Sequence, residues 1–411
     1  MKKFISYSTV FLLSVMMLTG CDNEDNPASR PFNLTTRQLS TIEQNNEFAF
    51  NIYRKLSKGD NADKSLVFSP LSATYLLSMV NAGMLGQGSE EIIKALGFEG
   101  CTIEELNELC QTMLFHSPRV DQNVMLWQAN CIVANKDVTI KDEYVDDMDF
   151  YYIAEVTSKD FSNPSTITYI NNWCKERTNG LIPKIINELD PHACMMLMNA
   201  IYFNAPWENK FDQEKTKKLR FTKEDGTTKF QPLMCKTSDF AYGINDKYAT
   251  VCLPYGNGKM WNMYVLLPNE GKKVKDVLSG LTPTSWKANV ANMTSKYDVN
   301  LRLPRFESSS ELTLNDALEA LGITAIFKQG VADFSRMTDI PDLYVNLIKQ
   351  KAVIKVTEKG TEAAAVTFTE EDGALPEETK TVNFFANHPF VYLIQEASSG
   401  AIFFIGTYHG E

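Results

Sequence analysis

Few residues of this sequence are arranged for metal binding or nucleophilic catalysis. The cysteines beyond residue 100 form no Cys-x-x-Cys pair and their number is odd, so neither a zinc site nor a framework of structural disulfides is indicated. Most are expected to be buried free thiols; they are Cys101, Cys110, Cys131, Cys174, Cys194, Cys235 and Cys252. The histidines are also few, which disfavours a site with several imidazole ligands; they are His116, His192, His388 and His409. We expect no metal and no cofactor.

The composition indicates a large folded core and argues against a nucleic-acid partner. Of the 411 residues, 44% are hydrophobic and 22% are charged, which is typical of a globular protein. Lysine and arginine number 40 against 51 acidic residues, so the net charge is −11. A chain with this charge balance is poorly suited to bind a phosphate backbone.

Residues 1–20 are predicted to be a signal peptide. Two lysines precede an apolar run from Phe4 to Leu18, which is too short for a stable membrane-spanning helix. The run leads into Leu18-Thr19-Gly20-Cys21, which resembles the lipobox of bacterial lipoproteins, where the cysteine thiol is acylated. Cys21 is therefore the expected lipidation site and membrane link. A plain secretory signal with a chance cysteine is the alternative.

Residues 21–40 are expected to form the lipidated terminus and a tether. The stretch from Asp22 to Arg30 is polar and acidic and contains Pro27. Acidic residues at Asp22, Glu24 and Asp25 resemble a signal that sends some lipoproteins to the outer cell face. The expected location is the bacterial outer membrane, with the body exposed at the cell surface.

Residues 41–411 read as one large α+β domain, because helical and strand patterns alternate without a repeat or a linker. Helices are predicted over residues 48–56, 69–80, 90–96, 104–114, 167–178, 274–281 and 315–321. Strands are predicted over 195–203, 250–253, 263–267, 300–303, 352–356, 390–395 and 401–406, of which the last two form a hairpin.

A segment of roughly thirty residues between Val356 and Phe390 is too long for an ordinary connection, so it is either functional or disordered. Its first part has small or β-branched side chains and no proline. Because strand residues alternate between faces, Thr361, Ala363, Ala365 and Thr367 would form a small, uncharged face that could slide between two strands. Gly360 would allow the chain to turn there. A solvated alanine-rich loop is the alternative.

Several segments resemble the serpin family in the order of the chain. Glu358 to Ala365 resembles the hinge of an inhibitory serpin, and Asn387-His388-Pro389-Phe390 resembles the C-terminal signature of the family. The likeness extends from about Asn45 to Tyr408. Further similar segments are Phe68-Ser69-Pro70-Leu71-Ser72, Asn171 to Asp190, Asn199 to Phe203 with Trp207 and Phe211, Pro304-Arg305-Phe306, and Leu321-Gly322-Ile323.

The resemblance implies a serpin fold with a large central β-sheet, two smaller sheets, about eight to nine helices and an exposed reactive-centre loop. That loop would span about residues 358–382. The implied activity is that of a suicide substrate for serine proteases, with cysteine proteases as a further class, and the protein would be a monomer rather than an enzyme. The hinge would comprise Glu358, Gly360, Thr361, Ala363, Ala364 and Ala365.

By the same resemblance, small and hydrogen-bonded residues would lie beneath the point where the sheet opens. They are Ser69, Ser72 and Asn199, with Gln350 where many animal serpins carry histidine. That difference argues against a pH-sensitive opening. Trp207 would pack where insertion begins. The alternative from the residues alone is that Ser69 is simply a helix cap and Asn199 an ordinary buried amide.

Counting seventeen residues from Glu358, as the family does, places the cleaved bond between Ala374 and Leu375. A small alanine would suit elastase-like or subtilisin-like proteases. The distance to Pro389 is longer than is common, so cleavage anywhere from Phe368 to Glu378 stays open; Phe368 would favour a chymotrypsin-like enzyme.

Two other functions stay open. The first is a non-inhibitory serpin-fold binding protein on the bacterial surface, which charges or proline among the hinge residues would favour. Such residues are absent at Thr361, Ala363 and Ala365. The second is a hydrolase or glycan-binding lipoprotein with a chance likeness, in which Ser69 or a cysteine would be the nucleophile.

Overall fold

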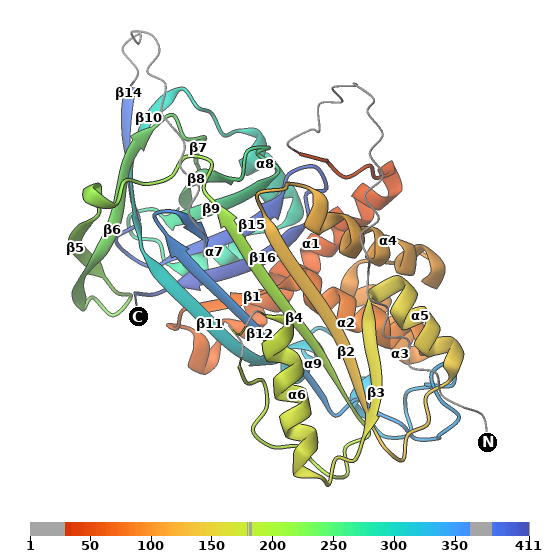
Figure 1. The fold of residues 1–411 in the computed structure, drawn as a ribbon. Helices are drawn as coiled ribbons and strands as arrows, with labels where there is room; N and C mark the ends of the chain where they lie inside the picture. Colours follow the sequence, from red (N-terminus) through yellow and green to blue (C-terminus); the bar gives the residue numbers. More distant parts are fainter. Residues whose placement is uncertain (1–28, 179, 181–182, 362–379, 411) are drawn as a thin grey trace, which may run out of the picture.

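The computed structural model describes residues 29–178, 180, 183–361 and 380–410. These residues contain nine α-helices and three β-sheets. Figure 1 shows how they are arranged. The helices are α1 (Thr36–Leu56), α2 (Pro70–Ala82), α3 (Gln87–Leu96), α4 (Ile103–His116), α5 (Asp142–Tyr152), α6 (Pro164–Arg177), α7 (Val274–Gly280), α8 (Pro283–Ala291) and α9 (Asn315–Glu319).

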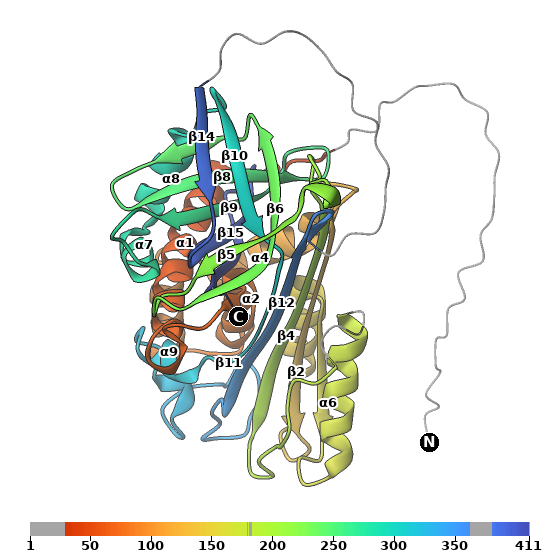
Figure 2. The same cartoon turned by 90° about the vertical axis from the view of Figure 1, so that its left-hand side faces the viewer.

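The main sheet has the strand order β11-β12-β13-β4-β2-β3. Its strands are β2 (Met125–Asn135), β3 (Ala154–Lys159), β4 (Met195–Pro206), β11 (Phe306–Thr313), β12 (Leu347–Thr357) and β13 (Gly360–Thr361). Figure 2 shows α6 on one face of this sheet and α1 and α2 on the other side. Ile170, Trp173 and Cys174 of α6 pack against Met196 and Met198 of β4, so the half of β4 near Met195 is covered.

Two further sheets complete the body. One has the order β1-β16-β15-β9-β8-β7 and the other the order β14-β10-β6-β5. The first contains β1 (Leu66–Phe68), β7 (Tyr242–Ile244), β8 (Tyr248–Tyr255), β9 (Trp261–Pro268), β15 (Phe390–Glu396) and β16 (Ile402–Tyr408). The second contains β5 (Lys217–Thr222), β6 (Thr228–Ser238), β10 (Tyr297–Pro304) and β14 (Lys380–Phe385).

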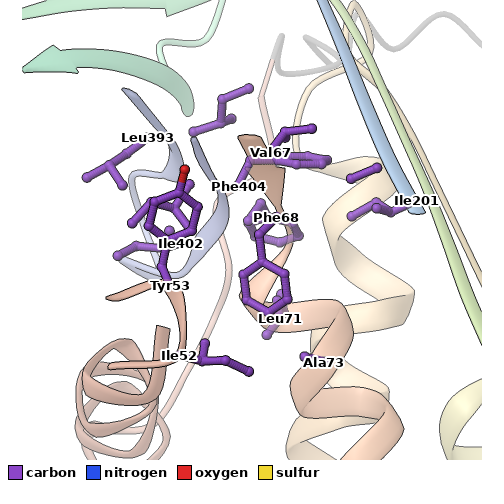
Figure 3. Close-up of a cluster of buried hydrophobic side chains, with 14 of the residues drawn as sticks. Ile52, Tyr53, Val67, Phe68, Leu71, Ala73, Ile201, Leu393, Ile402 and Phe404 are labelled. Carbon is purple, nitrogen blue, oxygen red and sulfur yellow. The ribbon is translucent and has the colours of Figure 1, made fainter. Parts of the chain in front are cut away.

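The core lies between the main sheet, α1, α2 and the β15–β16 hairpin. Figure 3 shows Phe68, Leu71 and Phe404 of this core, with Ile201 of β4 on the opposite side. Every residue of α2 is buried, which explains why it is apolar on all sides rather than on one stripe. The Ser69 side chain accepts a hydrogen bond from the Ser72 amide and Pro70 opens the first turn, so the start of α2 is fixed from within the sequence.

The folded body starts earlier than the boundary at residue 41 that the sequence suggested. Helix α1 begins at Thr36 behind a capping box formed by Thr35 and Gln38, and Ser29 already pairs with Asp121. At the other end of the long loop, β14 begins at Lys380, close to the predicted end of the loop at about residue 382. The predicted helices and strands are present with shifted ends. Two helices, α5 and α8, and the strands β1, β2, β3, β5, β6, β7, β11, β13 and β14 were not anticipated.

Candidate functional site

The site is the point where the chain leaves β12 and turns back between two strands of the main sheet. Thr361 of β13 pairs with Val356 of β12 on one side and with Ala205 of β4 on the other, antiparallel to both. The first two residues after the turn thus already form a short strand in the middle of the sheet. The chain is held in this position before any cleavage of the loop.

Gly360 permits this turn because no other residue fits its conformation. Its φ angle is +143°, a region that is essentially restricted to glycine. A Cβ atom here would lie 2.1 Å from the carbonyl oxygen of Ala205 and 2.6 Å from Cα of Pro206. The backbone of β4 therefore approaches this residue closely, which fixes where β13 can enter the sheet.

The buried Thr361 side chain contacts an aromatic pair beneath it. Its hydroxyl lies 2.7 Å from the hydroxyl of Tyr255, and the Tyr255 ring stacks on Trp207 with centroids 4.3 Å apart. Trp207 also binds the turn itself, since its indole N–H donates to the Thr357 carbonyl over 2.8 Å. Its backbone N–H donates to the Lys359 carbonyl over 3.0 Å. Trp207 therefore packs against the turn between β12 and β13 and against the tyrosine that contacts Thr361.

Glu358 anchors the same turn through charge. Its carboxylate accepts hydrogen bonds from Arg305 over 2.5 Å and from the Thr216 hydroxyl over 2.7 Å, and the residue is almost fully buried. Burial alone raises the pKa of Glu358, but these hydrogen bonds outweigh it and lower the pKa below its usual value. Glu358 is thus ionised at neutral pH and ties the turn to Arg305 and Thr216, which flank β10 and β5.

The strands on either side of β13 separate only along part of their length. Strands β12 and β4 pair directly and in parallel from Leu347 with Met196 to Lys351 with Ala200. In the described part of the chain, residues 352–355 of β12 have no partner strand on the side that faces β4. Pairing on that side resumes where Val356 meets Thr361. This leaves a stretch of backbone in the sheet that an added strand could pair with.

Three of the predicted sheet-opening residues are brought together where the direct pairing of β12 with β4 ends. The Gln350 side chain accepts from the Ser69 amide over 2.8 Å and donates to the Ser69 carbonyl over 2.9 Å. The Ser69 hydroxyl donates to the Ser72 hydroxyl over 2.9 Å. All three residues are buried, so β12 is tied to the start of α2 by a closed polar cluster.

Asn199 lies opposite Gln350 in the register of the sheet but belongs to a different hydrogen-bond chain. Its Nδ2 donates to Asn130 Oδ1 over 2.8 Å, and Asn130 in turn donates to the Tyr152 carbonyl. The Oδ1 atom of Asn199 is buried and has no hydrogen-bond partner among the described residues. A buried acceptor without a hydrogen bond destabilises the native state. A donor that reached this oxygen would remove that cost.

Part of the predicted site lies outside the described residues. Cys21, the hinge residues Ala363, Ala364 and Ala365, and the bond between Ala374 and Leu375 belong to that part. Sequence reasoning did not assign the partners Arg305, Thr216, Tyr255 and Asn130 to the site. Arg305 stood within a segment that resembles the family, and that resemblance was the available signal. The other three come from distant elements and carry no such signal.

Three of the buried thiols are poor nucleophiles. Burial raises the pKa of Cys110, Cys174 and Cys252 to about 12, which keeps them protonated and unreactive. All seven cysteines among the described residues are free thiols.

Within the described ranges, no helix has both the length and the hydrophobicity needed to cross a membrane.

Comparison with known proteins assigns the architecture. The profile of the family described as Serpin (serine protease inhibitor) matches residues 43–409. Human Serpin B11 is 31% identical over 90% of this chain and 98% of its own length, and human leukocyte elastase inhibitor is 31% identical over 90% and 99%. The crystal structure of the thermophilic serpin tengpin in its native state superposes with a TM-score of 0.83 at 28% identity, covering 93% of this chain and 96% of tengpin. Human thyroxine-binding globulin, solved with thyroxine, has a TM-score of 0.81 at 29% identity and coverages of 91% and 100%. The predicted fold is therefore confirmed, and the chain belongs to the serpin family.

Proposed function

We propose that this serpin inhibits serine proteases as a suicide substrate. The protease serine attacks the carbonyl carbon of Ala374, the bond to the Leu375 nitrogen breaks, and the new amine leaves with a proton. The resulting ester joins protease and inhibitor. The freed segment then extends β13 as a new strand between β12 and β4, which carries the attached protease along the sheet. The inhibitor itself contributes no catalytic group.

The observation that carries this proposal is that β13 enters the sheet between β12 and β4, next to a stretch where these two strands are not paired with each other. Seventeen inserted residues would span roughly 55 Å at about 3.3 Å each, so the protease would end near the opposite end of the sheet. Displacing reacting groups by about 1 Å can slow a reaction on the order of a hundredfold. The ester would therefore survive instead of being hydrolysed.

The register of β13 predicts how the segment would fit. Thr361 pairs with Ala205 and Val356, so continuing the antiparallel pairing by six residues would bring Thr367 beside Asn199 and Gln350. The residues that would share the face of Thr361 are Ala363, Ala365 and Thr367, which are small and uncharged. In that position, the Thr367 hydroxyl could donate to the Oδ1 atom of Asn199 that lacks a partner among the described residues.

The proposed targets are elastase-like or subtilisin-like proteases, because an alanine precedes the predicted cleaved bond; cysteine proteases are a further class. We also propose that acylation of Cys21 holds the protein on the bacterial outer membrane, on its cell-surface face.

Incubation with elastase, subtilisin and chymotrypsin tests the inhibition: a covalent complex stable in SDS is expected with at least one of them. Mass spectrometry of the released C-terminal peptide would locate the cleaved bond. Cleaved inhibitor and active protease with all three would instead favour the non-inhibitory binding protein.

A further inference from the structure

The described chain enters the body at a fixed point on its surface. Ser29 forms a β-bridge with Asp121, and the Arg30 amide donates to the Val120 carbonyl over 2.7 Å. The Phe32 ring then meets His116 edge-on with centroids 6.3 Å apart. Residues 29–32 therefore run along the segment that joins α4 to β2.

This entry point is held from the other side by the turn between β8 and β9. The buried Asp121 carboxylate accepts hydrogen bonds from the amides of Asn257 and Gly258 over 3.2 and 3.0 Å. A Cβ atom on Gly258 would lie 2.4 Å from Cβ of Ser29, so the two residues are in close contact. The place where the N-terminal tether meets the body is thus well defined.

Large apolar side chains are exposed beside this entry point. Phe115 at the end of α4 is 49% exposed, and Met125 and Trp127 at the start of β2 are 42% and 40% exposed. Three of the ten exposed large hydrophobic residues of the described chain fall within these 13 positions. The Arg119 guanidinium lies over the Phe115 ring, 4.0 Å from its centroid. We refer to Phe115, Arg119, Met125 and Trp127, which flank the entry point along the chain, as the entry patch.

The chain segments that contain the entry point and the entry patch have a different charge balance from the whole chain. Residues 29–34 and 115–127 contain Arg30 and Arg119 and a single acidic residue, Asp121, which is buried. The complete chain carries a net charge of −11. Exposed tryptophan and phenylalanine together with arginine are the side chains that favour the interface between water and an anionic lipid surface.

We propose that the entry patch rests on the lipid bilayer that holds the acyl chains of Cys21. This rests on the lipidation that forms part of the proposed function. Eight residue steps separate Cys21 from Ser29, and they span at most about 28 Å. Ser29 is therefore held within this distance of the lipid-linked Cys21, and tethering raises the effective concentration of the entry patch at the bilayer surface. Exposed apolar side chains at that position lose contact with water when they enter the interface.

Docking in this way sets the orientation of the reactive loop. The turn that holds Ser29 follows Tyr255, whose hydroxyl contacts Thr361 of the hinge. The entry patch and the hinge therefore lie at the same end of the main sheet. Insertion antiparallel to β4 proceeds from Ala205 toward Met195, so a captured protease would move away from the end of the sheet that carries the entry patch.

Tryptophan fluorescence tests the contact with lipid directly. Of the five tryptophans, Trp127 is exposed, whereas Trp173, Trp207, Trp261 and Trp286 are buried. The acylated full-length protein would be reconstituted into vesicles of phosphatidylethanolamine and phosphatidylglycerol, with or without phosphatidylcholine brominated on its acyl chains. We expect bromine to quench the emission, and Trp127→Phe to abolish the quenching. The matched variant Phe230→Ser, which removes an apolar side chain that is 61% exposed elsewhere, should quench like the wild type.

Two further variants separate docking from tethering. Arg119→Glu should reduce the quenching while the protein stays anchored, and Cys21→Ser should lose both anchoring and quenching. Equal quenching in wild type and Trp127→Phe, no quenching of the anchored wild type, or a mass spectrum without acyl chains on Cys21 would each overturn the proposal. Complex formation with elastase, measured on the same Cys21→Ser protein in solution, reports on inhibition independently of these results.

Discussion

The hydroxyl of Thr361 lies 2.7 Å from the hydroxyl of Tyr255, and Thr361 is fully buried in the main sheet. The first hinge residue beyond Gly360 has therefore already entered the sheet in the intact molecule. Strand insertion would extend an existing strand rather than start a new one, which removes the costly first step of opening the sheet. The four predictions that follow examine this arrangement.

A charge at Thr361 should stop insertion. Thr361→Arg would bury a cation without an acidic partner, which costs several kcal/mol or forces the hinge out of the sheet. We expect the yield of SDS-stable complex to fall sharply and cleavage as an ordinary substrate to rise. Thr361→Val keeps the size and loses only the contact with Tyr255, so it should still form complex. A normal yield from Thr361→Arg would be incompatible with insertion at this position.

Gly360→Ala should loosen the hinge in the native state. The added Cβ would collide with the Ala205 carbonyl oxygen, and the unfavourable φ alone costs about 1–3 kcal/mol. We expect a lower melting temperature and faster proteolysis between Thr357 and Thr361. Gly100→Ala is the matched control, because Gly100 has φ +81° and a Cβ added there would meet no atom within 4 Å. If both variants melt alike, the close approach to β4 has no influence on stability.

Acid should weaken the hinge through Glu358. Although burial raises its pKa, the hydrogen bonds from Arg305 and Thr216 lower it below the ordinary value of 4.5. A carboxyl with a lowered folded-state pKa contributes stability that is complete above its unfolded pKa and is lost as the pH falls through the folded value. Below pH 4.5, the melting temperature of the wild type should therefore fall more steeply than that of Glu358→Gln. Parallel curves for the two proteins would show that the pair with Arg305 contributes nothing.

Thr367 should stabilise the cleaved form and not the intact one. If its hydroxyl donates to Asn199 Oδ1 after insertion, Thr367→Val would remove that hydrogen bond, which contributes about 0.5–1.5 kcal/mol. The melting temperature of cleaved Thr367→Val should be lower than that of cleaved wild type, with no difference between the intact proteins. Thr367→Ser keeps the hydroxyl and serves as the control. An unchanged cleaved form would mean that the register does not continue as β13 begins it.

The local parts of the fold could be predicted from the sequence because they depend on neighbouring residues. Ser69 and Pro70 mark the start of α2 by capping, and the apolar runs at 390–395 and 401–406 correspond to β15 and β16. The resemblance of segments along the chain supplied the architecture. Helix α5 escaped prediction because its sequence, DEYVDDMDFYY, is acidic and aromatic with a weak apolar stripe.

The contacts of the site could not be predicted, since they join residues far apart in the chain. Glu358 meets Arg305 and Thr216, and Thr361 meets Tyr255, although these partners lie 53 to 142 positions away in the sequence. No local pattern in a single sequence specifies such pairs. The residue spacing also gave no sign that Asn199 would bond to Asn130 rather than join the cluster of Ser69 and Gln350.

The central claim is that the intact protein is metastable and that its cleaved loop inserts into the main sheet. Calorimetry of intact protein and of protein cleaved within residues 368–378 tests it most directly, at one pH and one concentration. Insertion predicts that the cleaved protein melts at a much higher temperature than the intact protein, and that Thr361→Arg loses most of this increase. A cleaved wild-type protein that melts at or below the temperature of the intact one would contradict the account.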